Sequence, residues 1–257
     1  MHHPHIDTYA EMDSLIHALD PRVKILSAVF IILGIVLTEP TAMLSFLLYA
    51  VFLSLLIKLS RLPLLFIFTR SLVIIPFVLM IAIFIPFYKE GDVAGAYSFG
   101  TINLTVTYDG LTILWNVLAK SYLSILCLII FTACTKFSVL LKALEKLKVP
   151  ALLIMIFSFM YRYSFLIVDE LMRMKQAKDS RSIAGSKLFH VKTLANMLGT
   201  LFINSYERAE SVYMAMRSRG FSGAIYTLYE FKLGAPDIAF AGSVIIFVTI
   251  TKLVTQI

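Results

Sequence analysis

The chain has few cysteines, few charges and none of the short motifs that identify common enzyme classes. Cys127 and Cys134 are its only cysteines, and their spacing predicts neither a zinc site nor a disulfide framework. We expect both to pack as small apolar residues. No His-Glu-x-x-His, Gly-x-Ser-x-Gly or phosphate-binding loop occurs in the sequence. These absences predict a non-catalytic protein that does not itself hydrolyse ATP.

Charged residues make up 15% of the 257 positions and hydrophobic residues 59%, and the mean hydropathy is +0.86. This composition is too apolar for an ordinary soluble domain. The net charge of +7 is concentrated in particular loops, where it indicates membrane orientation. No basic patch with interleaved aromatic residues points to a nucleic-acid partner. We therefore expect an all-α integral membrane protein in the lipid bilayer.

The first 20 residues lack the basic start and the small-residue cleavage site of a signal peptide, so the N-terminus is expected in the cytoplasm. The chain opens Met1-His2-His3-Pro4-His5. A terminal amine with nearby histidines can chelate a transition metal, which makes His2, His3 and His5 weak candidate ligands. An unstructured tail is the favoured interpretation, because chain termini are usually loosely held.

About five apolar runs have a length suited to crossing a bilayer. In the third run, Pro76 and Pro86 are expected to kink the helix. In the fourth run, Lys120 is expected to have a structural partner. The loop 88–109 carries no excess of positive charge, which places it outside, and 101–107 could form a short strand without an evident partner strand. The five runs are 23–38, 41–57, 71–87, 110–135 and 237–253.

The apolar run 150–168 lies between two basic segments that are both expected in the cytoplasm. One simple crossing cannot connect two cytoplasmic segments. The run is therefore predicted to lie along the inner face, or a further crossing is hidden nearby. Its soft and aromatic side chains suit an adaptable interface at membrane level, although internal packing explains any one of them about as well. The candidate interface residues are Met155, Phe159, Met160 and Tyr163.

A polar island from Asp169 to Gly220 contains two arginine signatures, Asp179-Ser180-Arg181-Ser182 and Arg217-Ser218-Arg219-Gly220. Each is expected at the C-terminal end of a helix, the first helix opening at Asp169 and the second stopping at Gly220. A base followed by glycine is also an ordinary helix stop. The repetition favours two guanidinium groups that enter acceptor-lined clefts on a partner protein.

The acids of the polar island, among them Glu170 and Glu207, are expected to form a solvated face. The chain is predicted to divide into an N-terminal tail with four transmembrane helices (1–135), a cytoplasmic or interfacial coupling domain of long helices (136–232) and a C-terminal transmembrane helix (233–257).

The stretch Leu19-Asp20-Pro21-Arg22-Val23-Lys24, the membrane runs and the paired arginine motifs resemble the T component of energy-coupling-factor (ECF) transporters, and most of all the cobalt type, CbiQ. The resemblance implies a transmembrane scaffold in the cell membrane that joins two ABC-type ATPase subunits to a small substrate-binding membrane subunit. ATP-Mg would be bound by the ATPases and no cofactor by this chain. The implied ATPase-coupling residues are Ser180, Arg181, Ser182, Ser218, Arg219 and Gly220.

The family usually has glycine where Ser182 stands in this chain. The resemblance implies uptake of cobalt or nickel, and a vitamin-type substrate subunit would be compatible with the same coupling motifs. The permease of an ordinary ABC importer is a further alternative, although such a permease usually offers one coupling helix per chain. A membrane enzyme is disfavoured because this sequence shows no catalytic set of residues. A stand-alone carrier is disfavoured because the sequence shows neither paired intramembrane charges nor a repeated half.

Overall fold

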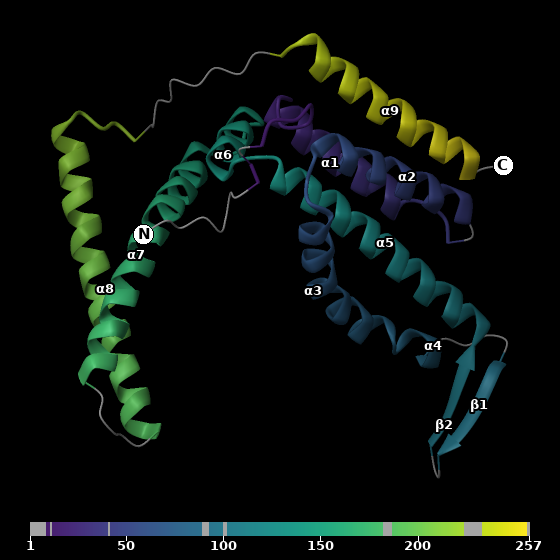
Figure 1. The fold of residues 1–257 in the computed structure, drawn as a ribbon, viewed down its shortest axis with the longest axis horizontal. Helices are drawn as coiled ribbons and strands as arrows, with labels where there is room; N and C mark the ends of the chain where they lie inside the picture. Colours follow the sequence, from purple (N-terminus) through teal and green to yellow (C-terminus); the bar gives the residue numbers. More distant parts are fainter. Residues whose placement is uncertain are drawn as a thin grey trace. The chain divides into compact units, whose positions relative to one another are not determined.

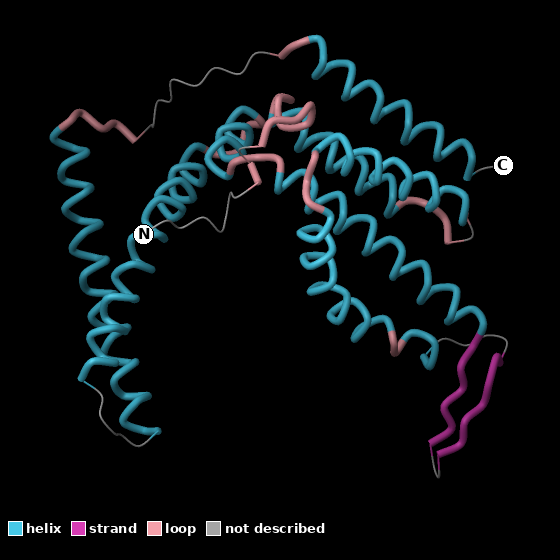
Figure 2. The backbone as a smooth tube through the Cα atoms, viewed as in Figure 1, coloured by secondary structure: helices cyan, strands magenta, loops and turns pink. Residues whose placement is uncertain are grey.

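The computed structural model of the protein describes residues 9–10, 12–40, 42–88, 93–99, 102–181, 187–223 and 233–255. Within these ranges the chain is helical apart from one β-hairpin (Figures 1 and 2). The elements are α1 (Pro21–Val36), α2 (Met43–Ser60), α3 (Leu64–Ala82), α4 (Ile85–Tyr88), β1 (Val93–Phe99), β2 (Ile102–Thr107), α5 (Tyr108–Ala133), α6 (Phe137–Lys146), α7 (Ala151–Arg181), α8 (Lys187–Ser218) and α9 (Ala235–Thr255).

The chain forms two compact units. The N-terminal unit comprises Pro4–Leu140 together with Glu230–Ile257, and the central unit comprises Leu141–Tyr229. Helices α1 to α5 and α9 belong to the N-terminal unit, whereas α7 and α8 belong to the central unit.

Among the described residues, four helices are long and apolar enough to cross a membrane: α2, α5, α7 and α9. A shorter apolar stretch, Leu64–Met80, lies in α3, and α1 has 16 residues. Together α1, α2, α3, α5 and α9 overlap the five apolar runs of the sequence. The prediction of an all-α membrane protein is confirmed.

The core of the N-terminal unit lies where α1 and α2 pack against α5 and α9 (Figure 1). Its side chains are aliphatic with a few aromatic rings, as expected for residues shielded from both lipid and water. Cys127 and Cys134 are buried thiols outside any disulfide, which agrees with the packing role predicted for them. The most deeply buried members include Ile31, Ile35, Tyr49, Leu53, Leu56, Ile130 and Val244.

Buried polar contacts tie three helices together at one end of this unit. Asp20 caps α1, since its Oδ1 accepts a 2.8 Å bond from the N–H of Arg22. Its own N–H donates to Oδ1 of Asp237, in the first turn of α9. The Lys24 ammonium, only 2% exposed, donates to the carbonyl oxygens of His17 and Cys134 at 3.0 and 3.1 Å. The Leu19 to Lys24 stretch therefore joins α1 to α9 and to the end of α5.

Lys120, the basic residue within the fourth apolar run, has the structural partner expected of it. Its Nζ donates a 2.9 Å bond to the carbonyl oxygen of Val36, in the last turn of α1. A carbonyl there lacks an intrahelical donor and lies at the negative end of the helix dipole. The ammonium thus satisfies an acceptor that α1 itself leaves unpaired.

The third apolar run was predicted to begin at Ser71, and this is wrong because α3 begins at Leu64. Pro63 takes the N-cap position of α3, and the helix continues through Arg70, whose guanidinium lies 4.9 Å from the centre of the Phe66 ring. Pro76 lies inside α3, which is bent (Figure 1). Pro86 lies in the separate short helix α4, because a proline lacks the backbone N–H that would continue α3.

The strand expected at 101–107 is confirmed as β2, and its partner is β1, which the sequence did not reveal. The two strands lie side by side (Figure 2) and pair antiparallel, and the register shifts between Val93 and Gly95. Ala94, Gly95 and Ala96 lie in β1, and both residue types are depleted in strands. The Ala-Gly-Ala sequence of β1 therefore gives little indication of a strand.

Candidate functional site

Both arginine signatures lie at helix ends of the central unit. Helix α8 ends at Ser218, and Gly220 has a φ of +81°. The N–H of Gly220 donates to Arg217 O at 3.0 Å and the N–H of Phe221 to Met216 O at 3.1 Å. These two bonds form a Schellman motif, which satisfies carbonyls that the helix leaves unpaired. The predicted left-handed stop at Gly220 is confirmed, and it fixes Arg219 just beyond the last helical turn.

Helix α7 ends at Arg181. Ser180 Oγ donates to the Gln176 carbonyl at 2.9 Å, a local bond within the helix, whereas Ser182 lies outside the described residues. Arg181 and Arg219 are both exposed, and no hydrogen bond or ion pair joins either guanidinium to another residue that the structure describes.

Helix α7 is longer than the sequence predicted. The polar segment was expected to open a new helix at Asp169, with acids in its first turn; instead, Asp169 lies in the middle of one helix of 31 residues. No glycine or proline occurs between Ala151 and Arg181 to end the helix. The helix passes directly from the apolar interface residues to the arginine end. By length and hydropathy it is also a candidate membrane span, so the placement of 150–168 along the inner face stays a prediction.

Helices α7 and α8 cross each other (Figure 1). One hollow of about 420 Å³ lies between the C-terminal part of α7 and the N-terminal part of α8. Arg181 is part of its wall, so the arginine borders a recess formed by both helices. The other lining residues are Met174, Ala177, Lys178, His190, Thr193, Asn196, Met197 and Thr200.

A second hollow, of about 270 Å³, lies between the two helices on the N-terminal side of α7. Three of the four predicted interface residues, Phe159, Met160 and Tyr163, line it, but Met155 does not. The rings of Phe159 and Tyr163 lie 6.3 Å apart. The remaining lining residues are Ile167, Ser205, Arg208, Ala209, Val212 and Met216. The predicted interface residues therefore share a largely apolar recess with the helix that carries Arg219.

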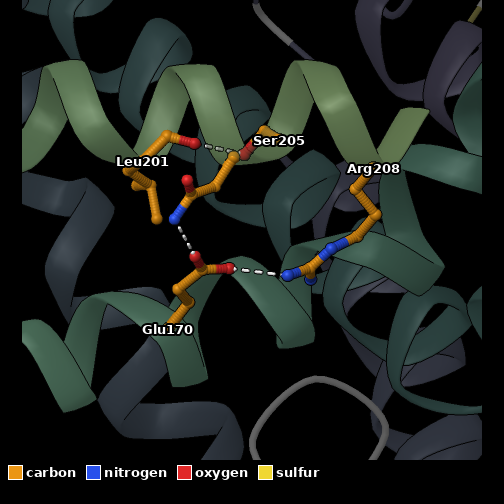
Figure 3. Close-up of polar contacts among 5 residues, drawn as sticks. Glu170, Leu201, Ser205 and Arg208 are labelled. Carbon is orange, nitrogen blue, oxygen red and sulfur yellow. Dashed lines mark hydrogen bonds and ion pairs between the residues drawn. The ribbon is translucent and has the colours of Figure 1, made fainter. Parts of the chain in front are cut away.

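Between the two hollows, Glu170 of α7 contacts two side chains of α8 (Figure 3). Its Oε1 accepts a 2.7 Å bond from Asn204 Nδ2, and its Oε2 accepts a 2.9 Å bond from Arg208 Nη2. The Glu170 side chain is 20% exposed. Its prediction as part of a solvated acidic face is therefore wrong: the Arg208 guanidinium and the Asn204 amide each donate a hydrogen bond to the carboxylate at the helix crossing. Sequence reasoning had no signal that would pair residues 38 positions apart.

The described residues contain no group of three or more histidine, cysteine, aspartate or glutamate side chains that could hold a metal ion. The weak candidate ligands His2, His3 and His5 lie outside the described residues.

The sequence profile of the CbiQ family, described as cobalt transport protein, matches residues 12–228. The chain is 31% identical to an uncharacterised protein of Methanocaldococcus jannaschii over 91% of this chain and 80% of that protein. It is 28% identical to the energy-coupling factor transporter transmembrane protein EcfT of Limosilactobacillus fermentum, over 83% and 82% of the two chains. It is 24% identical to EcfT of Ruminiclostridium cellulolyticum, over 95% and 94%.

Proposed function

The chain belongs to the CbiQ family of cobalt transport proteins, and from this premise we propose that it transmits ATP-driven motion from cytoplasmic ATPase subunits to a separate substrate-binding membrane subunit. It is a multi-pass transmembrane component of an ECF-type transporter, the class to which its EcfT relatives also belong. The ATPases bind ATP-Mg and hydrolyse the ATP, whereas this chain binds no cofactor.

The observation that carries the proposal is the pair of exposed arginines at the ends of two crossing helices. Arg181 ends α7 and Arg219 follows α8, and neither guanidinium is engaged by a described residue. An arginine fork can donate two parallel hydrogen bonds to a carboxylate or to paired carbonyls. One arginine for each of two ATPase subunits is the simplest use of two such ends.

The substrate-binding subunit is proposed to dock on the recess of about 270 Å³ that Phe159, Met160 and Tyr163 line. Met160 is exposed and the rings of Phe159 and Tyr163 are half-buried, and such soft and aromatic side chains are suited to contact with another membrane helix. Because α8 lines the recess as well as carrying Arg219, motion at the ATPase end reaches this surface through continuous helices.

The N-terminus is proposed to be cytoplasmic. In the N-terminal unit, one hollow is lined by residues of the N-terminal segment, among them Met12 and His17, by Lys58 and Arg61 at the end of α2, and by Lys136 after α5. Basic residues gather at the cytoplasmic ends of membrane helices. Three bases at the same end as the N-terminal segment therefore support this orientation.

Cobalt or nickel is the proposed cargo, in keeping with the name of the family. The test is affinity purification of the chain from its native membrane in mild detergent, with identification of the proteins retained. Two ATPase chains or an ATPase homodimer with a small membrane subunit are expected, and metal uptake by the recovered complex in liposomes identifies the cargo. A retained subunit that binds a vitamin would refute the metal assignment alone. A chain recovered without partners that still transports substrate would refute the coupling role.

A further inference from the structure

Glu170 connects α7 and α8 through one carboxylate that uses both of its oxygens. The bonds to Asn204 and Arg208 are 2.7 and 2.9 Å long. Asn204 and Arg208 are four positions apart and so lie on the same face of α8, one turn from each other. The three residues, which we call the clasp, therefore fix one point of α7 against one turn of α8 (Figure 3).

The clasp lies between two recesses. On one side, Phe159, Tyr163 and Ile167 of α7 face Val212 and Met216 of α8 across the apolar recess. On the other side, α7 approaches its end at Arg181 beside residues from the first half of α8. The order of these residues shows that the helices run antiparallel. Open space on both sides leaves the crossing angle less constrained by packing than it would be along a continuous seam.

The two arginine ends are placed symmetrically about the clasp. Arg181 follows Glu170 by 11 positions, and Arg219 follows Arg208 by 11 positions. At 1.5 Å per residue each arm is about 16 Å long. Because the helices are antiparallel, the arms extend in opposite directions from the crossing. A change of crossing angle therefore displaces both arginines by similar amounts.

We propose that the clasp of Glu170, Asn204 and Arg208 is the fulcrum of the coupling movement, and this rests on the function proposed above. Movement of the ATPases displaces the arginine ends, the helices turn about the clasp, and the recess lined by Phe159 and Tyr163 changes width. Glu170 and Arg208 are positioning residues: they touch neither ATP nor cargo. The carboxylate keeps the crossing point fixed, so that motion of one arm becomes motion of the other.

The test uses the full complex with spin labels at Gln176→Cys and Ser211→Cys, which place one probe on each arm at exposed positions. The native thiols Cys127 and Cys134 are buried. The distance between the labels is measured without nucleotide and with a non-hydrolysable ATP analogue and Mg²⁺. The unaltered clasp is expected to give a narrow distance distribution that the analogue shifts.

Glu170→Arg is expected to broaden the nucleotide-free distribution and abolish the shift while the ATPases stay bound. The charge swap Glu170→Arg with Arg208→Glu is expected to restore both, because the Asn204 amide can turn to present its oxygen to the new arginine. The matched control is Glu207→Arg, an exposed reversal of charge on α8, which is expected to behave as the parent.

A narrow distribution and an undiminished shift in Glu170→Arg would overturn the fulcrum and leave the coupling role intact. Failure of the charge swap to restore the shift would also overturn it, since the pair would then act only in folding. Absence of ATPase subunits from the parent complex would refute the proposed function, whereas the nucleotide-free distribution would still report whether the clasp fixes the crossing.

Discussion

The backbone N–H of Asp20 donates a 2.7 Å hydrogen bond to Oδ1 of Asp237, although 217 positions separate the two residues. Oδ2 of the same carboxylate accepts a 2.8 Å bond from the N–H of Gly234. Asp237 is 5% exposed; its bond to Asp20 is buried and its bond to Gly234 is partly buried. The last helix of the chain is thereby attached to the start of the first.

Asp237→Ala is expected to lower the stability of the protein in detergent by about 2–4 kcal/mol, because the buried N–H of Asp20 and the partly buried N–H of Gly234 lose a charged acceptor. Thermal unfolding of the purified chain measures the change. Thr249→Ala is the matched control in the same helix, since Thr249 is exposed and its hydroxyl bonds only within α9. A similar melting temperature for both variants would contradict a role for Asp237 in attaching α9.

Gly34→Ala is expected to destabilise the N-terminal unit by about 1–3 kcal/mol through overpacking. A Cβ at this position would lie 2.6 Å from Tyr49 Oη and 3.0 Å from Val248 Cγ1, and Tyr49 is fully buried. Gly242→Ala in α9 is the control, because nothing lies within 4 Å of the added Cβ. Thermal unfolding should give a lower melting temperature for Gly34→Ala than for Gly242→Ala. Equal melting temperatures would show that the Tyr49 side chain moves away from the added Cβ without loss of stability.

Gly220→Ala is expected to weaken retention of the ATPases. The φ of +81° costs a residue with a Cβ about 1–2 kcal/mol, while nothing lies within 4 Å of the added atom. The strain favours a different helix end and so a different position for Arg219. Gly220→Asn should retain more binding, since asparagine enters this conformation more readily. Co-purification compares both with Gly199→Ala, and equal recovery in all three would refute the prediction.

Acidification is expected to destabilise the N-terminal segment through His17. Burial lowers the pKa of His17 below its ordinary value of 6.5, and the nearby Lys24 lowers it further, against the Tyr9 carbonyl and Asp13. The fold therefore favours the neutral ring, whose Nε2–H donates to Tyr9 O at 2.9 Å. The contribution of the neutral His17 ring to the stability of the fold is fully present above pH 6.5 and declines as the pH falls below that value.

His17→Gln should flatten this dependence, because the variant has no imidazole to protonate. Melting temperatures measured from pH 7.5 down to pH 5.5 compare it with the parent. Parallel curves for the two proteins would show that other groups cause the acid sensitivity.

The sequence predicted helices where apolar runs or capping residues give a local signal. Gly220 marks the end of α8 because its conformation depends on few neighbours. The predicted start of α3 was too late because Arg70 interrupts the apolar run in the sequence, whereas in the structure its guanidinium lies over the Phe66 ring. The extension of α7 through Asp169 was missed for a similar reason: a change in polarity was taken as a boundary although no helix-breaking residue occurs there.

The contacts that organise the molecule could not be predicted from the sequence, since they join residues distant along the chain. Asp20 bonds to Asp237, Lys24 to Cys134, and Glu170 to Arg208. Each partner has an ordinary local interpretation as a cap, a loop charge or a solvated side chain. Only helix packing brings the partners within hydrogen-bonding distance.

The most direct test of the coupling role is the affinity of the ATPase subunits for Arg219→Ala, with Arg217→Ala as the matched control. Arg217 is two positions away, and its guanidinium lies 6.0 Å from the centre of the Tyr213 ring. Loss of Arg219 is expected to cost about 2–5 kcal/mol of docking free energy, because it leaves desolvated acceptors on the ATPase unpaired. Removal of Arg217 should leave binding near the parent value. Equal binding of the ATPases to the Arg219→Ala variant and to the parent would contradict docking through the arginine end.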